Sequence, residues 1–168
     1  RAADWDEAIR QALRIGAEGS ILGHLRGGFP TWADAGGALE SSGRLTVDQL
    51  ADRLDRGGED APLVIDVRQA GEYATGHIPG SIHITAGSLP DRLADLPLDR
   101  PIAVVCASGF RSSIGASILR SGGFRDVSWV ASGVPAWRAS GRTIVRGETP
   151  DRHPAKETTP REPVQAGG

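Results

Sequence analysis

Short apolar runs alternate with helical patterns between Leu45 and Val145, and this alternation restricts the fold more than any other feature of the sequence. The apolar runs, each of strand length, are PLVIDV, SIHI, PIAVVC and DVSWV. The segments predicted as helices are TVDQLADRLDRG, AGEYATG, SLPDRLADLP and SSIGASILRSGG. Strands that alternate with helices along a chain favour an α/β domain with a mainly parallel sheet and helices on both faces.

Residues at the ends of these segments predict where the helices begin and end. We expect Thr46 to cap the first helix and Ser88 to cap the third, which has Pro90 in its first turn. Gly76 and Gly122 are expected to end the second and the fourth helix.

Composition excludes several functional classes. The chain has 168 residues and 39% apolar content, which is enough for one domain with a real core. A net charge of −2 gives no electrostatic reason to bind nucleic acid or an anionic membrane surface. No apolar run approaches the roughly 18 residues of a membrane span, and a single cysteine cannot form an internal disulfide. We therefore expect a cytoplasmic protein with no nucleic-acid or membrane partner.

The single cysteine, Cys106, lies where a strand is predicted to turn into a helix that begins near Ser112. Ligands of open α/β sheets bind at the carboxyl ends of the strands, and this turn is at such an end. Gly109 allows a tight turn in which successive N–H groups converge, and the helix adds its unpaired amides and positive dipole end. In such surroundings the pKa of a cysteine falls to roughly 3.5 to 7.5, against about 8.5 for a free thiol. Arg111 adds a positive charge that can support the thiolate or hold an anionic substrate.

A purely structural role is the competing interpretation of Cys106. A free cysteine at the end of a buried strand usually behaves as a small hydrophobic residue. The continuation Ser-Gly-x-Arg-Ser favours a functional loop, because a core cysteine needs no such polar residues after it.

Three blocks in this order resemble the rhodanese family of sulfurtransferases over about residues 41–148: VIDVRQAGEYATGHIPGSIHI, VVCASGFRSS and ASGVPAWRASG. The resemblance implies an α/β rhodanese fold with a central five-stranded parallel sheet flanked by helices. It also implies that Cys106 accepts a sulfane sulfur as a persulfide and passes it to cyanide, sulfite or a thiol. Besides Cys106 and Arg111, the residues implied to cradle the sulfur are Ala107, Ser108, Gly109, Phe110 and Ser112. The alternative is a non-catalytic rhodanese-like module that binds a partner or regulates an attached upstream enzyme.

The spacing in the loop distinguishes sulfur transfer from phosphate chemistry. A cysteine phosphatase or arsenate reductase loop needs one residue more between cysteine and arginine than the four found here, Ala107–Phe110. Thiosulfate-using rhodaneses often carry basic residues directly after the cysteine, where this chain has the neutral Ala107 and Ser108. A glutathione persulfide or protein persulfide donor is therefore expected to be more suitable than thiosulfate.

Other polar residues receive mainly structural interpretations. Asp66 and Arg68 leave a strand at the same sheet edge as Cys106 and are secondary candidates for the site. Glu72 and His77 are expected to fix the turn that follows. The histidines share no metal-ligand spacing, so no metal and no cofactor are expected.

The opening segment weakly repeats a later one. Residues 13–36 align with residues 119–141 once a one-residue gap is allowed. The matched residues are Leu13, Arg14, Gly16, Gly28, Trp32 and Gly36 with Leu119, Arg120, Gly122, Gly133, Trp137 and Gly141. This pattern favours an internal duplication.

The earlier copy lacks the parts of a working loop, because Ala3 and Trp5 stand where Gly109 and Arg111 stand in the later one. The expected organisation is a degenerate half-repeat (residues 1–40), an active rhodanese domain (residues 41–148) and a disordered tail (residues 149–168). The arrangement also resembles fusions in which a metallo-β-lactamase-fold persulfide dioxygenase precedes rhodanese modules, so such an upstream domain is the expected partner.

Overall fold

The computed structural model describes residue 9, residues 22–39 and residues 41–147. The chain divides into two compact units, Arg1–Ser41 and Ser42–Gly168. The predicted tail of residues 149–168 lies outside the described residues.

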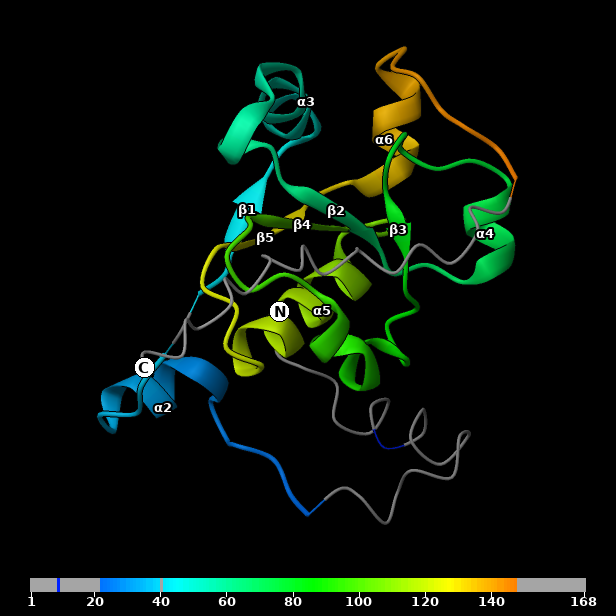
Figure 1. Cartoon of the computed structure of the whole chain (residues 1–168). Helices are drawn as coiled ribbons and strands as arrows, with labels where there is room; N and C mark the ends of the chain where they lie inside the picture. The colour runs from blue at the N-terminus through cyan, green and yellow to red at the C-terminus, as the bar shows by residue number, and fades with distance from the viewer. Residues whose placement is uncertain (1–8, 10–21, 40, 148–168) are drawn as a thin grey trace, which may run out of the picture. The chain divides into compact units, whose positions relative to one another are not determined.

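The second unit is built on a five-stranded sheet in which every pair of neighbouring strands is parallel (Figure 1). The strands are β1 (Gly43–Leu45), β2 (Leu63–Asp66), β3 (Ile82–His83), β4 (Ile102–Val105) and β5 (Val127–Val130). Their order across the sheet is β1-β5-β4-β2-β3, which puts β4 in the middle. The predicted α/β fold with a five-stranded parallel sheet is confirmed.

Helices cover both faces of this sheet, and two clusters of buried side chains fill the space between. The helices are α3 (Val47–Arg56), η2 (Gly58–Asp60), α4 (Ala70–Ala74), η3 (Leu89–Asp95), α5 (Phe110–Ser121) and α6 (Gly133–Ala139). One cluster joins α5 and η3 to one face, and the other joins α3 and α6 to the opposite face (Figure 1). Along β2, Leu63 and Ile65 belong to the first cluster and Val64 to the second, so the continuous apolar runs reflect burial on both faces.

The two predicted helix caps had different outcomes. The Thr46 hydroxyl accepts a hydrogen bond from the N–H of Gln49, whose side chain accepts one from the N–H of Thr46, so this capping box is present. Ser88 is the residue before the next helix, as predicted, but its side chain makes no capping bond, and its hydroxyl pairs with that of Thr85 at 2.8 Å. The segment that follows is the 3₁₀ helix η3, with Pro90 in its first turn as expected.

In the first unit, residues 22–39 contain the short helix α2 (Gly28–Asp34). Its Trp32 indole N–H donates to the carbonyl of Ala38 at 3.0 Å, and the Trp137 indole of α6 donates to the carbonyl of Thr143 at 2.9 Å. Both bonds span six residues, which is the local geometry a repeat would share. The assignment of residues 1–40 to a degenerate repeat stays a prediction, because most of that segment lies outside the described residues.

No helix in the described ranges combines the length and the apolar character that crossing a membrane requires.

Candidate active site

Cys106 directly follows β4, the middle strand, at the carboxyl edge of the sheet. The residue is 1% exposed, and its Sγ accepts a hydrogen bond from the N–H of Gly109 at 3.1 Å. Gly109 has φ of 97°, and a Cβ there would meet the ring of Trp129 at 3.1 Å. A glycine is thus required at the point where the chain turns back over the sulfur.

Helix α6 supports the loop from the other face of the sheet. The N–H of Val134 donates to the carbonyl of Cys106 at 2.9 Å. Gly133 has φ of 50°, and a Cβ on it would overlap that carbonyl oxygen. The backbone of the cysteine therefore packs directly against the start of α6.

Ser112 is the polar side chain next to the sulfur. It is fully buried in the first turn of α5, with its Oγ 3.5 Å from Sγ. Its hydroxyl donates to the carbonyl of Gly109 at 3.0 Å, while the thiol donates to Oγ. Because a hydroxyl hydrogen can rotate, the same group can donate to the sulfur once the thiol has lost its proton.

These surroundings favour the thiolate of Cys106. Burial raises the pKa of the thiol, but hydrogen bonds from the Ser112 side chain and from the amides of Ser112, Ser108 and Gly109 lower it by more. The net effect is a pKa below the ordinary value, in the direction expected for a nucleophilic cysteine.

This lowered pKa predicts how Cys106 reacts across the pH range. The rate of alkylation by iodoacetamide, followed by intact mass, should rise along a curve whose midpoint lies below the value of about 8.5 for a free thiol. Ser112→Ala should move the midpoint upward, because it removes a hydrogen bond that favours the charged form. A wild-type midpoint at or above that of a free thiol would contradict the prediction.

Arg111 does not stand alone beside the loop. Its Nη1 and Nη2 donate to Oε2 and Oε1 of Glu72 at 2.7 and 2.9 Å, a bidentate ion pair across 39 positions of sequence. The Arg111 hydrogen bond is the main reason why the pKa of Glu72 is lowered to about 2. The carboxylate also accepts a hydrogen bond from the N–H of Gln69 at the start of α4. The carboxylate of Glu72 thus caps the start of α4 and also binds the loop arginine, which the sequence did not indicate.

Asp66 and Arg68, the secondary candidates, form a buried ion pair at the end of β2. Arg68 Nη2 lies 2.7 Å from Asp66 Oδ2 and also donates to the carbonyl of Gly76 at 2.8 Å. His77 stacks on the ring of Tyr73 with a centroid distance of 3.7 Å. These contacts hold the loop after α4 to the end of β2, as a structural interpretation expects.

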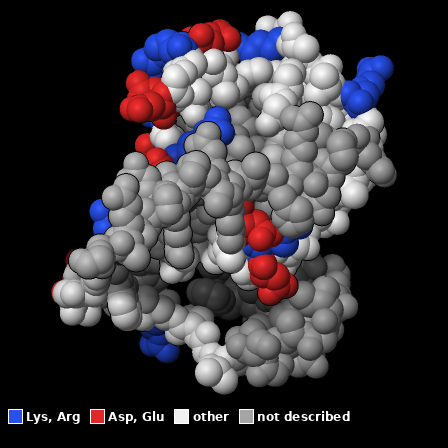
Figure 2. Space-filling model, in the orientation of Figure 1, with Lys and Arg blue, Asp and Glu red and all other residues white. Residues whose placement is uncertain are grey.

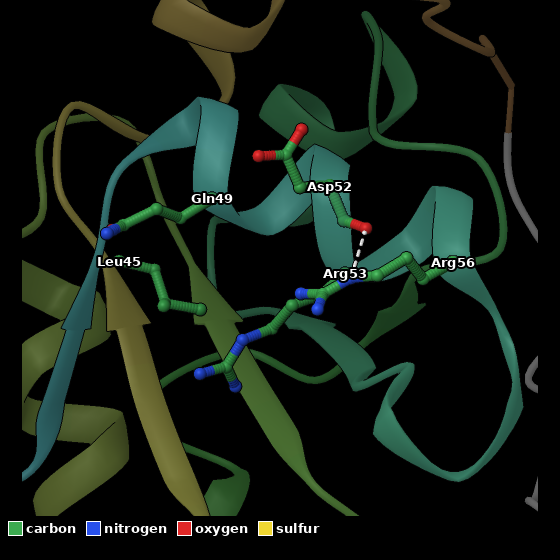
Figure 3. A pocket seen from close by; sticks show the side chains of 5 residues that line it. All are labelled: Leu45, Gln49, Asp52, Arg53 and Arg56. Carbon is green, nitrogen blue, oxygen red and sulfur yellow. Dashed lines mark hydrogen bonds between the residues drawn. The ribbon is translucent and has the colours of Figure 1, made fainter.

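A hollow of about 230 Å³ beside α3 offers no competing site for nucleophilic chemistry (Figure 3). Its lining residues are Leu45, Gln49, Asp52, Arg53 and Arg56, none of which belongs to the cysteine loop. Figure 2 shows charges of both signs intermixed over α3. Within the described part of the chain, no three His, Cys, Asp or Glu side chains gather in a way that could hold a metal ion.

Comparisons with known proteins agree with this architecture. Residues 46–140 match the model of the rhodanese-like domain. The thiosulfate sulfurtransferase GlpE of Pseudomonas savastanoi pv. phaseolicola is 39% identical over 82 residues, which cover 49% of this chain and 77% of the relative. The putative sulfur carrier protein YrkF of Bacillus subtilis is 31% identical over 123 residues, or 72% of this chain and 63% of the relative.

Among solved structures, the rhodanese-like domain of the Anabaena sp. Alr3790 protein is 33% identical, with a TM-score of 0.57. The alignment covers 63% of this chain and 80% of that one. A rhodanese-like domain protein from Staphylococcus aureus is 28% identical with a TM-score of 0.56, over 63% of this chain and 99% of that one. Because the family model matches residues 46–140, more than half of the chain, this protein belongs to the rhodanese-like domain family.

Proposed function

We propose that this chain is a sulfurtransferase that carries a sulfane sulfur as a persulfide on Cys106. The observation that carries the proposal is the hydrogen-bonded sulfur at the carboxyl end of β4, where the N–H of Gly109 donates to Sγ at 3.1 Å. The lowered pKa of the thiol supports a nucleophile at this position. The similarity to relatives named thiosulfate sulfurtransferase supports the reaction class.

The proposed reaction has two displacement steps. In the first, the Cys106 thiolate attacks the terminal sulfur of a persulfide R–S–SH, forming Cys–S–SH and releasing R–S⁻. With thiosulfate as donor, the same attack gives Cys–S–S⁻ and releases sulfite. In the second, cyanide, sulfite or a thiolate attacks the terminal sulfur, takes it up, and leaves the Cys106 thiolate behind.

In this proposal the loop stabilises the charge on the sulfur. In this proposal the terminal sulfur, about 2 Å beyond Sγ, is cradled by the amides of Ala107, Ser108, Gly109, Phe110 and Ser112, of which the Gly109 amide already donates to Sγ. Backbone N–H groups that converge at the start of α5 favour an anion there without carrying a full charge. Arg111 lies beside the loop in its ion pair with Glu72, and the Asp66–Arg68 pair holds the neighbouring strand end in position.

Intact-mass measurement after incubation with glutathione persulfide or thiosulfate tests the proposal. The protein should gain the mass of one sulfur atom from at least one donor and should lose it on addition of cyanide, with thiocyanate as product. Alkylation of Cys106 beforehand should prevent the gain. A protein that gains no sulfur from either donor overturns the proposal.

A non-catalytic binding module is the competing proposal. The observation that favours it is the burial of Cys106, which is only 1% exposed and lies in the core cluster against which Trp129 packs. The same mass measurement decides between the two, because a binding module gains no sulfur.

A further inference from the structure

The ion pair between Glu72 and Arg111 determines the charge that a donor meets at the loop. Arg111 lies in the first turn of α5, five positions after Cys106, and its pKa is raised first by the hydrogen bond to Glu72 and to a smaller extent by the charge of Cys106. Both terminal nitrogens of its guanidinium are directed at Glu72, at 2.7 and 2.9 Å. The positive charge nearest to the loop along the chain is therefore already neutralised.

The other loop residues do not replace this charge. Ala107, Ser108, Gly109 and Phe110 are all neutral. The next arginine toward β2, Arg68, is bound to Asp66 at 2.7 Å in a buried pair. The four charged side chains, two arginines and two acids, thus compensate each other, and the charge of the thiolate is opposed mainly by backbone N–H groups and the Ser112 hydroxyl.

We propose that Glu72 is the residue that sets donor specificity, because by holding Arg111 it makes the loop a poor site for the thiosulfate dianion and leaves persulfides as the better donors. This inference rests on the proposed function and concerns the same cysteine. A thiosulfate dianion must bring two negative charges against the thiolate, and it releases a sulfite dianion at the same place. Glutathione persulfide carries its carboxylates away from the transferred sulfur, so it depends less on a cation at the rim.

Two groups hold the carboxylate of Glu72 in place. The N–H of Gln69 donates to Oε2 of Glu72 at 3.1 Å while Arg111 binds both oxygens. The pKa of about 2 keeps Glu72 charged across the physiological range. Glutamine can still accept the bond from Gln69, so Glu72→Gln removes the charge and leaves the start of α4 capped.

The test compares sulfur loading of Glu72→Gln and wild type with two donors. With thiosulfate, kcat/KM should rise about tenfold or more, because an unpaired guanidinium attracts the dianion into the site, and the gain should shrink at high salt. With glutathione persulfide, kcat/KM should change less than about twofold. Asp95→Asn is the matched control. It also removes one negative charge from an arginine–carboxylate ion pair, because Asp95 Oδ2 lies 2.6 Å from Arg92 Nε. Asp95 ends η3 and does not belong to the cysteine loop.

A second comparison asks whether the gain passes through Arg111. Glu72→Gln should give no thiosulfate gain when it is introduced into Arg111→Gln. The inference is overturned if Glu72→Gln leaves the ratio of thiosulfate to persulfide activity unchanged, or if Asp95→Asn raises that ratio equally. A wild-type protein that takes no sulfur from either donor overturns the proposed function and the inference with it, whereas loading by glutathione persulfide with an unchanged ratio overturns the inference alone.

Discussion

Cys106→Ser is expected to gain no sulfur from any donor, with a loading rate at least about 10³-fold below that of the wild type. A serine hydroxyl is scarcely ionised at neutral pH, whereas the pKa of the Cys106 thiol is lowered by its hydrogen bonds. Intact mass after incubation with glutathione persulfide measures the difference directly.

The fold should survive this substitution, which makes the result specific. The serine oxygen can still accept the hydrogen bond that Gly109 donates to the sulfur, so the free energy of unfolding should change by less than about 2 kcal/mol. Ser112→Ala serves as the companion variant: it should load sulfur more slowly, yet to the same final mass. Cyanide-sensitive sulfur on folded Cys106→Ser would exclude Cys106 as the carrier.

Gly133→Ala is expected to lower the free energy of unfolding by about 2–4 kcal/mol and to slow sulfur loading at the same time. The new Cβ would overlap the carbonyl oxygen of Cys106, so the start of α6 or the cysteine loop must move. Overpacking of this kind costs about 1–3 kcal/mol, and a left-handed backbone at a residue with a Cβ adds about 1 kcal/mol. Urea unfolding of the purified variants measures the first effect, and intact mass measures the second.

Gly123→Ala separates the overlap from the backbone strain. Gly123 also has a left-handed backbone, with φ of 94°, but a Cβ there would meet nothing within 4 Å. This control should lose only about 1 kcal/mol and should load sulfur at the wild-type rate. If both variants lose the same free energy of unfolding and the same rate of sulfur loading, the overlap with the Cys106 carbonyl adds nothing to the backbone strain, and the prediction is wrong.

The fold was largely predictable from the sequence because its determinants are local. Strands such as β4 are buried on both faces, so their sequences are continuous apolar runs that are easily recognised. The helices predicted between these runs favour parallel pairing of the strands. Strand β1 was not among the predicted apolar runs, because it has three residues and only Leu45 is buried. Ser88 occupies the predicted cap position but makes no capping bond, because its hydroxyl pairs with that of Thr85, three residues earlier.

The site was predictable only where its residues are contiguous. Cys106, Gly109 and Ser112 share one loop, so spacing alone indicates that they lie together. Glu72, the partner of Arg111, lies 39 positions away, and charge alone could not distinguish it from the other acidic residues between β2 and β4. The contact of Gly133 with the carbonyl of Cys106 depends on how closely α6 approaches the sheet, which no local pattern encodes.

The deep position of Cys106 also bears on how long a sulfur atom can stay on the protein. In the proposed reaction, a sulfur carried on a residue that is 1% exposed is shielded from thiols in bulk solution. Its lifetime then depends on how rarely a molecule of the right shape enters past the loop. Burial of Cys106 at the end of the middle strand is therefore expected to slow transfer of the stored sulfur to small thiols in solution. It favours transfer to an acceptor whose shape fits the loop.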